Sequence, residues 1–180
     1  MSESARAQLV RDLAIGVIAA AAPLPVWVAC DDEEVANFAS EHGADVVWVS
    51  AEGGLSGAAQ AGVAHLAEAG FDVVTVAHGD LGLVSELLSV GRDVGEGGES
   101  EVSIAPDRRL DGTNVITVPA RSGFVFAYGS GSFGRHCAEA ARLRLECRTL
   151  YDWSLALDVD LPDDLQVLAG YGPVPERIKS

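Results

Sequence analysis

Lysine is almost absent from this chain, which limits how it could bind anions. The 180 residues include 12 lysines and arginines, of which Lys179 is the one lysine, against 27 aspartates and glutamates. The formal net charge is −15 at pH 7. Nucleic acids and anionic membranes select basic surfaces, so neither is expected as a partner. An anionic substrate would have to be held by arginine, by backbone amides or by a metal ion.

Cysteine and long apolar runs are also scarce. Cys30, Cys137 and Cys147 show no C-x-x-C or zinc-like spacing, and the four histidines are scattered likewise. Reduced thiols in a cytoplasmic protein are the simplest interpretation, and no zinc site is expected. No segment approaches the roughly 20 apolar residues of a membrane span. The first residues also lack a signal-peptide pattern.

The apolar content that is present suffices for one core. With 48% hydrophobic residues, residues 1–180 are expected to form a single domain. Helical spacing and short apolar runs alternate through the first half of the chain, with helices predicted over 5–21 and 55–69 and strands over 26–30, 44–49 and 71–77. Such runs between helices are typical of a parallel sheet covered on both faces. The predicted fold is therefore α/β, with a doubly wound, mostly parallel sheet and helices on both faces.

The second half departs from this alternation. NVITV and FVFAY favour a small antiparallel excursion, and a polar, glycine-rich surface loop is expected over 91–101. The remaining elements predicted from residue 83 onward are a short helix over 83–90, a strand in VSIAP, a helix over 132–145, strands in ECRTL and SLALDVD, and a closing helix from about 162 to 169.

Three places at the ends of predicted strands could carry chemistry, because open α/β sheets bind ligands there. They are Asp80, the pair Asp158 and Asp160, and the loop AYGSGSFGRH at 127–136. The paired carboxylates lie two residues apart on a strand, so they project to the same side and repel unless a cation lies between them. Each acid alone could instead be structural, Asp80 as a helix cap and Asp160 as part of a turn.

A magnesium ion would relieve that repulsion. Two or three carboxylates, completed by water and phosphate oxygens, usually hold this metal in proteins. A chain of net charge −15 that binds a phosphorylated substrate needs such a cation. The sequence therefore predicts Mg²⁺ bound by Asp80, Asp158 and Asp160.

The loop at 127–136 has the composition of an anion site. Gly129 and Gly131 let the backbone approach a ligand, and Ser132 is a natural N-cap for the helix that follows. Phosphate binds readily at the positive end of a helix, and Arg135 lies one turn in. An ordinary serine-capped helix after a glycine turn is the structural alternative.

Taken in order, these motifs resemble a family of guanylyltransferases. DGTN (111–114), YGSGSFGRH (128–136) and LALDVDLPDDL (155–165) resemble the G-T-x stretch, the F-G-x-x-S-x-x-R-H loop and the D-V-D-T-P-x-D-L tail of CofC and FbiD. GDLGL (79–83) is similar to their G-D-L-P-x-L, and GGLSGAAQAG (53–62) to their nucleotide loop. The resemblance runs from about residue 5 to about residue 170.

The resemblance implies a GT-A-like nucleotidyltransferase that acts in deazaflavin coenzyme F-420 biosynthesis. Such an enzyme joins GTP to phosphoenolpyruvate or 2-phospho-L-lactate, both small phosphorylated three-carbon acids, and releases pyrophosphate. The family's metal aspartates match Asp80, Asp158 and Asp160. Its acceptor-binding residues match Thr113, Gly129 and Ser132, with Arg135 beside them, and its nucleotide contacts fall at Leu55, Ser56 and Gly57.

The chain departs from the family pattern in several places. Family members begin with a strand and a basic loop that holds the triphosphate, whereas this chain starts at the helix that would follow. Leu161, Ser56 and Gly82 stand where the family has Thr, Asn and Pro. The arginines left to replace the basic loop are Arg108, Arg109, Arg121 and Arg135.

Two classes of function therefore stay open. The chain is either an active guanylyltransferase whose start is set too late, or a degenerate, inactive member that binds a phosphorylated metabolite or a partner. A nucleotidyltransferase of sugar phosphates or molybdopterin is a third alternative, against which the loop at 127–136 argues. The choice between phosphoenolpyruvate and 2-phospholactate is open, as is the oligomeric state, including a homodimer.

Overall fold

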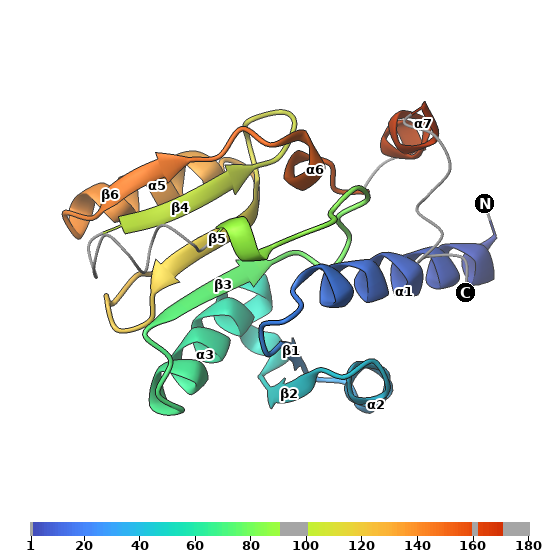
Figure 1. Ribbon diagram of the computed structural model, residues 1–180, viewed down its shortest axis with the longest axis horizontal. Coiled ribbons are helices and arrows are strands. Elements are labelled where there is room, and N and C mark those ends of the chain that lie inside the picture. The colour runs from blue at the N-terminus through green and yellow to red at the C-terminus, as the bar shows by residue number, and fades with distance from the viewer. Residues whose placement is uncertain (1, 91–100, 160–161, 171–180) are drawn as a thin grey trace.

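The first third of the chain forms a small parallel sheet between helices. In the computed structural model, which describes residues 2–90, 101–159 and 162–170, strands β1 and β2 pair in parallel (Figure 1). The elements are α1 (Glu3–Ala20), β1 (Trp27–Cys30), α2 (Glu33–Glu41), β2 (Asp45–Trp48), η1 (Ala51–Gly53) and α3 (Gly54–Glu68). Asp32 begins α2 as its N-cap, because its side chain accepts the amide protons of Glu34 and Val35.

The rest of the chain forms a four-stranded sheet of mixed direction. Its strands are β3 (Val73–Ala77), β4 (Glu101–Pro106), β5 (Thr113–Pro119) and β6 (Glu146–Thr149), in the order β3-β5-β4-β6. Strand β5 runs antiparallel to both of its neighbours, and β4 pairs in parallel with β6. Within the described residues, this half also contains a helical turn at 88–90 and the helices α5 (Ser132–Arg142), α6 (Trp153–Ala156) and α7 (Pro162–Gly170).

Helices cover both faces of the four-stranded sheet, as expected for an α/β fold (Figure 1). One face packs against α3 and α5 through buried apolar residues: Ala59, Val63, Val74, Val102, Ile104, Ile116, Val118 and Ala140. The other face packs against the end of α1, the segment 81–90 and α6, through Ala20, Leu81, Leu87, Val90, Ala105, Val115 and Leu155. Successive residues of a strand face opposite sides, so β4 and β5 supply both clusters.

The predicted doubly wound, mostly parallel sheet is not confirmed, because β5 runs antiparallel within the second sheet. All seven residues of β5 are buried. NVITV, predicted as part of a small antiparallel excursion, lies in β5 and is antiparallel, but it pairs with β3 and β4 and not with FVFAY. The other half of the predicted excursion, FVFAY, forms no strand in the described chain, although Phe124 and Phe126 are buried in the core.

Several smaller predictions also need correction. SLALDVD does not form the predicted strand within the described residues: its first three residues belong to α6, and Asp158 forms an isolated bridge to Leu81. The helix expected over 83–90 is present only at 88–90, and α5 ends at Arg142 rather than at residue 145. The surface loop expected at 91–101 falls almost wholly outside the described residues. Within the described ranges, every helix is too short or too polar to cross a bilayer.

Candidate active site

Polar residues gather where β3 ends and β5 begins. The His78 N–H donates to the Asn114 carbonyl at 2.9 Å, continuing the ladder one residue past β3. Two residues on, the Asp80 carbonyl accepts from the Val159 N–H at 3.2 Å, and Leu81 bridges to Asp158. Segments far apart in sequence thus bring His78, Asp80 and Asp158 to one end of the sheet. Strand ends are the places where open α/β sheets bind ligands, so a ligand contact at these residues stays a prediction.

A β-bulge at Asn114 decides which side chains face this end of the sheet. Ala105 pairs with Val115, whereas Pro106 pairs with Thr113, so Asn114 is an extra residue in β5. An extra residue reverses the faces of the residues before it. Accordingly, the Asn114 amide donates to the Leu155 carbonyl of α6 at 3.0 Å. Thr113 instead turns toward α5, where its hydroxyl lies 3.0 Å from a ring nitrogen of His136.

Asp80 and Asp158 form the acidic part of the site. Asp158 is buried, and Asp80 is half-buried with its Oδ1 atom lacking any hydrogen-bond partner among the described residues. Burial raises the pKa of the Asp80 carboxyl; the His78 ring lowers it, and Asp158 adds a smaller increase. Asp80 caps no helix, because the segment that follows is irregular up to residue 88. The structural alternative for Asp80 is therefore not supported.

These two carboxylates fit a hard cation such as magnesium. A buried carboxylate oxygen without a donor, next to a second carboxylate, is stabilised when a divalent ion offsets both charges. Asp160, the third predicted ligand, lies outside the described residues. Within the described part of the chain, no three potential metal-ligating side chains gather at one point. The structure therefore describes two of the three predicted metal ligands, Asp80 and Asp158.

Arg135 organises the loop that precedes α5. Its guanidinium donates to the carbonyl oxygens of residues 127–130, at distances of 2.5–3.2 Å. Because these carbonyl oxygens all accept from Arg135, the amide groups between them stay available to other partners. Indeed, the N–H groups of Gly129 and Ser130 make no hydrogen bond within the described chain. Arg135 therefore shapes the loop, and the backbone amides are the groups that can receive an anion.

Ser132 is not the N-cap of α5, contrary to the prediction. The N-cap is Gly131, in the left-handed conformation at φ 74°, and Ser132 is the first helical residue, with 1% of its surface exposed. Asp111 satisfies the helix end instead: its carboxylate accepts the Gly131 N–H and its carbonyl accepts the Phe133 N–H, both at 3.0 Å. The helix therefore starts at a glycine turn and is capped from the β4–β5 turn, so serine is not needed for capping.

The predicted nucleotide residues lie at the start of α3, next to this loop. The Ser56 hydroxyl accepts the Tyr128 N–H at 2.9 Å, which joins the two predicted binding segments directly. Leu55 is 52% exposed, and open space surrounds the Cα of Gly57 where a side chain would project. The structure thus brings the predicted nucleotide segment beside the predicted acceptor loop. A contact with nucleotide stays a prediction for all three residues.

Sequence reasoning missed three aromatic residues that line the same region. The ring of Tyr128 lies 5.3 Å from that of His78 and 5.0 Å from that of His136, between centroids. The Tyr128 hydroxyl and His78 Nε2 are buried without a hydrogen-bond partner in the described chain, and burial raises the pKa of Tyr128. Buried polar atoms without partners mark places where a ligand can bind. The available signal was position: His78 follows the strongest strand, and Tyr128 and His136 flank the glycine loop.

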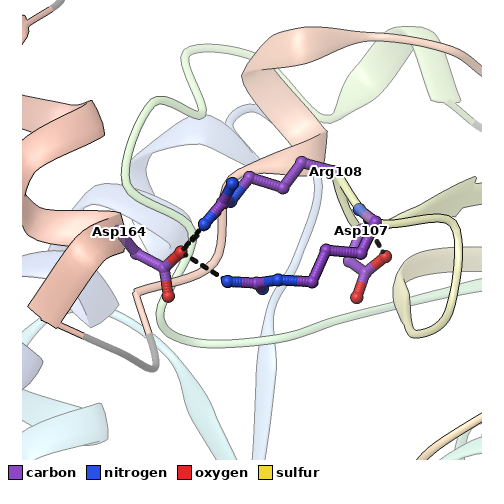
Figure 2. Close-up of polar contacts among 4 residues, drawn as sticks. Asp107, Arg108 and Asp164 are labelled. Carbon is purple, nitrogen blue, oxygen red and sulfur yellow. Dashed lines mark hydrogen bonds and ion pairs between the residues drawn. The ribbon is translucent and has the colours of Figure 1, made fainter.

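The four arginines proposed to replace a basic loop are all engaged in structural contacts. Arg108 and Arg109 both donate to Asp164 of α7, at 2.6 and 3.0 Å, and this carboxylate has no exposed surface (Figure 2). Arg121 pairs with Asp72 at 2.8 Å and also donates to a carbonyl of α3. Arg135 holds its own loop, as described above. Each of the four therefore already has a partner within the protein.

Comparison with known proteins places the chain in a family. The model of a family described as "Guanylyl transferase CofC like" matches residues 1–173. A phosphoenolpyruvate guanylyltransferase of Chloroflexus aggregans is 31% identical, over 89% of this chain and 82% of its own. A 3-phospho-D-glycerate guanylyltransferase of Phenylobacterium zucineum is 29% identical, over 98% of this chain and 83% of its own.

A shorter match is more similar but covers less. It is 42% identical over 76 residues to a phosphoenolpyruvate guanylyltransferase of Sphaerobacter thermophilus, of which it spans 37%. The family match, by contrast, includes the strand-end acid Asp80, Thr113 beside the bulge at Asn114, and the glycine loop before α5. The chain therefore belongs to the CofC-like guanylyl transferase family.

Proposed function

We propose that this protein transfers the guanylyl group of GTP to phosphoenolpyruvate and releases pyrophosphate, as a step in deazaflavin coenzyme F-420 biosynthesis. The observation that carries the proposal is the meeting of three groups at one end of the sheet: the two carboxylates, Thr113 beside the β-bulge, and the glycine loop with unpaired amides. The family and the names of its relatives support the same reaction.

The reaction needs positioned groups more than reactive side chains. A phosphate oxygen of the acceptor attacks the α-phosphorus of GTP, the bond from this phosphorus to the oxygen bridging to the β-phosphate breaks, and pyrophosphate leaves. The attacking phosphate is already ionised, so no protein nucleophile is required. Holding both substrates in line supplies much of the rate, and groups that offset developing charge supply the rest.

The acceptor half of the site is formed by Thr113 and the loop before α5. The acceptor's phosphate and carboxylate would receive hydrogen bonds from the Thr113 hydroxyl, the Gly129 amide and the Ser132 hydroxyl. Arg135 acts here indirectly, because its bonds to residues 127–130 fix the direction of the amides. Phosphoenolpyruvate, 2-phospho-L-lactate and 3-phospho-D-glycerate all present a phosphate and a carboxylate on three carbons, so each fits this description.

The nucleotide and metal half lies beside it. Leu55, Ser56 and Gly57 would contact the nucleotide at the start of α3, where the positive helix end favours phosphate. Mg²⁺ would be held by Asp80 and Asp158, together with Asp160. When bound, this ion would offset negative charge on the phosphates. Without it, the carboxylates of Asp80 and Asp158 would repel a triphosphate.

An inactive member that binds a phosphorylated acid is the second candidate function. One observation favours it: the four arginines that could neutralise a triphosphate are all engaged elsewhere in the structure. The two candidates separate in one experiment. The 180-residue chain is incubated with GTP, Mg²⁺ and each of the three acids, and pyrophosphate is measured. Acid binding by calorimetry without pyrophosphate release would identify the inactive binder, and release would establish the transferase.

A further inference from the structure

His136 is a buried residue of α5 that contacts both parts of the acceptor half. It has no exposed surface, and its Nε2 atom lies 2.9 Å from the backbone nitrogen of Ala127, at the start of the glycine loop. Its Nδ1 atom lies 3.0 Å from the Thr113 hydroxyl. Aromatic rings of Phe124, Phe126 and Tyr128 surround it at centroid distances of 5.0–6.1 Å. The ring is therefore fixed between a loop amide and the hydroxyl of Thr113, which is predicted to bind the acceptor.

These two contacts determine which ring nitrogen carries the proton. A backbone N–H can only donate, so Nε2 accepts and carries no hydrogen. Burial, helped by the charge of Arg135, lowers the pKa of His136 to about 4, so the ring is neutral near pH 7. A neutral imidazole carries one ring proton, which must then lie on Nδ1. Consequently Nδ1 donates, and the Thr113 oxygen accepts.

The direction of this bond sets the role of Thr113. A hydroxyl that accepts from His136 keeps its own hydrogen for another partner, and Thr113 makes no other side-chain hydrogen bond in the described chain. We propose that His136 is a positioning residue that commits the Thr113 hydroxyl to donate to the phosphate or carboxylate of the acceptor. This role rests on the proposed function. It extends the site to a residue that need not touch the substrate.

Two matched variants separate the two contacts of His136. Asparagine places an amide nitrogen near the position of Nδ1, so His136→Asn keeps the donor to Thr113 and loses the acceptor for Ala127. Glutamine places an amide oxygen near the position of Nε2, so His136→Gln keeps the acceptor and loses the donor. Each removes one hydrogen bond and the aromatic ring. The loop stays held by Arg135 and Ser56 in both variants.

Phosphoenolpyruvate binding is then measured by calorimetry on wild type and both variants. His136→Gln should weaken binding about tenfold or more, as expected for losing an oriented bond to a charged group, and His136→Asn should stay within about threefold of wild type. In a Thr113→Val background, His136→Gln should cause no further loss. Equal weakening by His136→Asn and His136→Gln would overturn the proposed role of His136, as would a further loss from His136→Gln in the Thr113→Val background. Neither result would bear on the proposed function.

Direct observation of the tautomer gives a test that does not depend on folding of the variants. Long-range proton–nitrogen correlation spectra of ¹⁵N-histidine-labelled wild type, without ligand, should show a protonated Nδ1 and an unprotonated Nε2 for His136. Protonation at Nε2 would overturn the proposal. If wild type shows the expected tautomer but binds none of the three acids, the proposed function fails, and with it the role toward a substrate.

Discussion

Two turns lie at the same end of the second sheet, and they are held together in opposite ways. In the loop at 127–131, the guanidinium of Arg135 binds four carbonyl oxygens. In the turn at 107–111, the carboxylate of Asp107 binds the N–H groups of Arg109 and Asp111, at 3.0 and 2.9 Å. Both segments are mostly polar, and glycine lies within the loop at 127–131 and directly after the turn at 107–111. Their chemistry toward a ligand is nevertheless reversed.

The difference lies in which backbone groups are used up. A cation that binds carbonyls leaves amides available, and amides are the groups that bind phosphate. A carboxylate that binds amides consumes them and adds negative charge. Asp111 even takes an amide from the other loop, through its bond to the Gly131 N–H. The side chain that holds a loop from within therefore determines whether its amides are available to an anion. Glycine content alone does not.

Asp107→Ala should have the largest effect on stability. The side chain is buried and accepts from two amides, so its loss removes two hydrogen bonds to a charged group and should lower the free energy of unfolding by about 3 kcal/mol. Asp107→Asn keeps one oxygen acceptor and should cost about 1 kcal/mol. Urea unfolding monitored by circular dichroism measures both. A loss below that of the Asn control would mean that the turn holds its shape without this carboxylate.

Arg135→Met should break the other turn and affect binding as well. Four hydrogen bonds to an exposed guanidinium are lost, which should cost about 2 kcal/mol of stability and leave the amides of 129 and 130 without a fixed direction. Phosphoenolpyruvate affinity should fall about tenfold or more. Arg135→Lys, which keeps the charge but not the fork, serves as control. If lysine restores full affinity, the charge acts on the ligand directly and the loop geometry is secondary.

Low pH should lower the free energy of unfolding, because His136, which holds the loop at 127–131, is neutral in the folded protein. The pKa of His136 is about 4 when folded, below the ordinary value near 6.5, so between these values the unfolded chain binds more protons. Stability therefore falls as pH drops through this window. Between pH 7.5 and 5.5 this contribution should be about 1 kcal/mol.

The His136→Asn variant isolates that contribution. Asp80, whose pKa is raised, favours the folded state at low pH and so acts in the opposite direction. Because both proteins retain Asp80, the difference between their unfolding free energies at each pH reports on His136. Parallel curves for the two proteins across this window would show that His136 is not held neutral.

Asp111→Asn should have the smallest effect and the opposite sign for binding. The amide oxygen can still accept from the Gly131 N–H, so stability should change by about 0.5 kcal/mol. Removing a negative charge beside the loop should tighten phosphoenolpyruvate binding about twofold. Salt titration is the check, because the gain should vanish as ionic strength rises. Weaker binding at every salt concentration would mean that the carboxylate itself organises the acceptor half.

The sequence predicted the position of the site better than its geometry. Asp80 was found because it follows the strongest apolar run, and the loop before α5 because glycines precede a helical pattern. Both signals are local. The bulge that turns Thr113 toward His136 depends instead on the register between β4 and β5, which no single segment encodes. The same holds for the N-cap: Ser132 looks suitable locally, but Asp111, 20 residues away from Gly131, satisfies the helix end.

Pairing across long separations also explains the arginines. Nothing near Arg108 or Arg109 in sequence indicates that both bind Asp164, which lies 56 and 55 residues further on. From the sequence alone, these arginines are expected to be available to bind a triphosphate. Burying the Asp164 carboxylate without compensation would be costly, and in the structure two arginines offset its charge.

The turn at 107–111 also joins two parts of the molecule mechanically. From one side its arginines bind Asp164 and so fix α7, the helix that follows the segment containing Asp158 (Figure 2). From the other side Asp111 holds the beginning of α5. A displacement of this turn would therefore move the metal side and the acceptor side together. The two substrates are then expected to bind with thermodynamic coupling, each changing the affinity for the other, although no ligand need contact the turn itself.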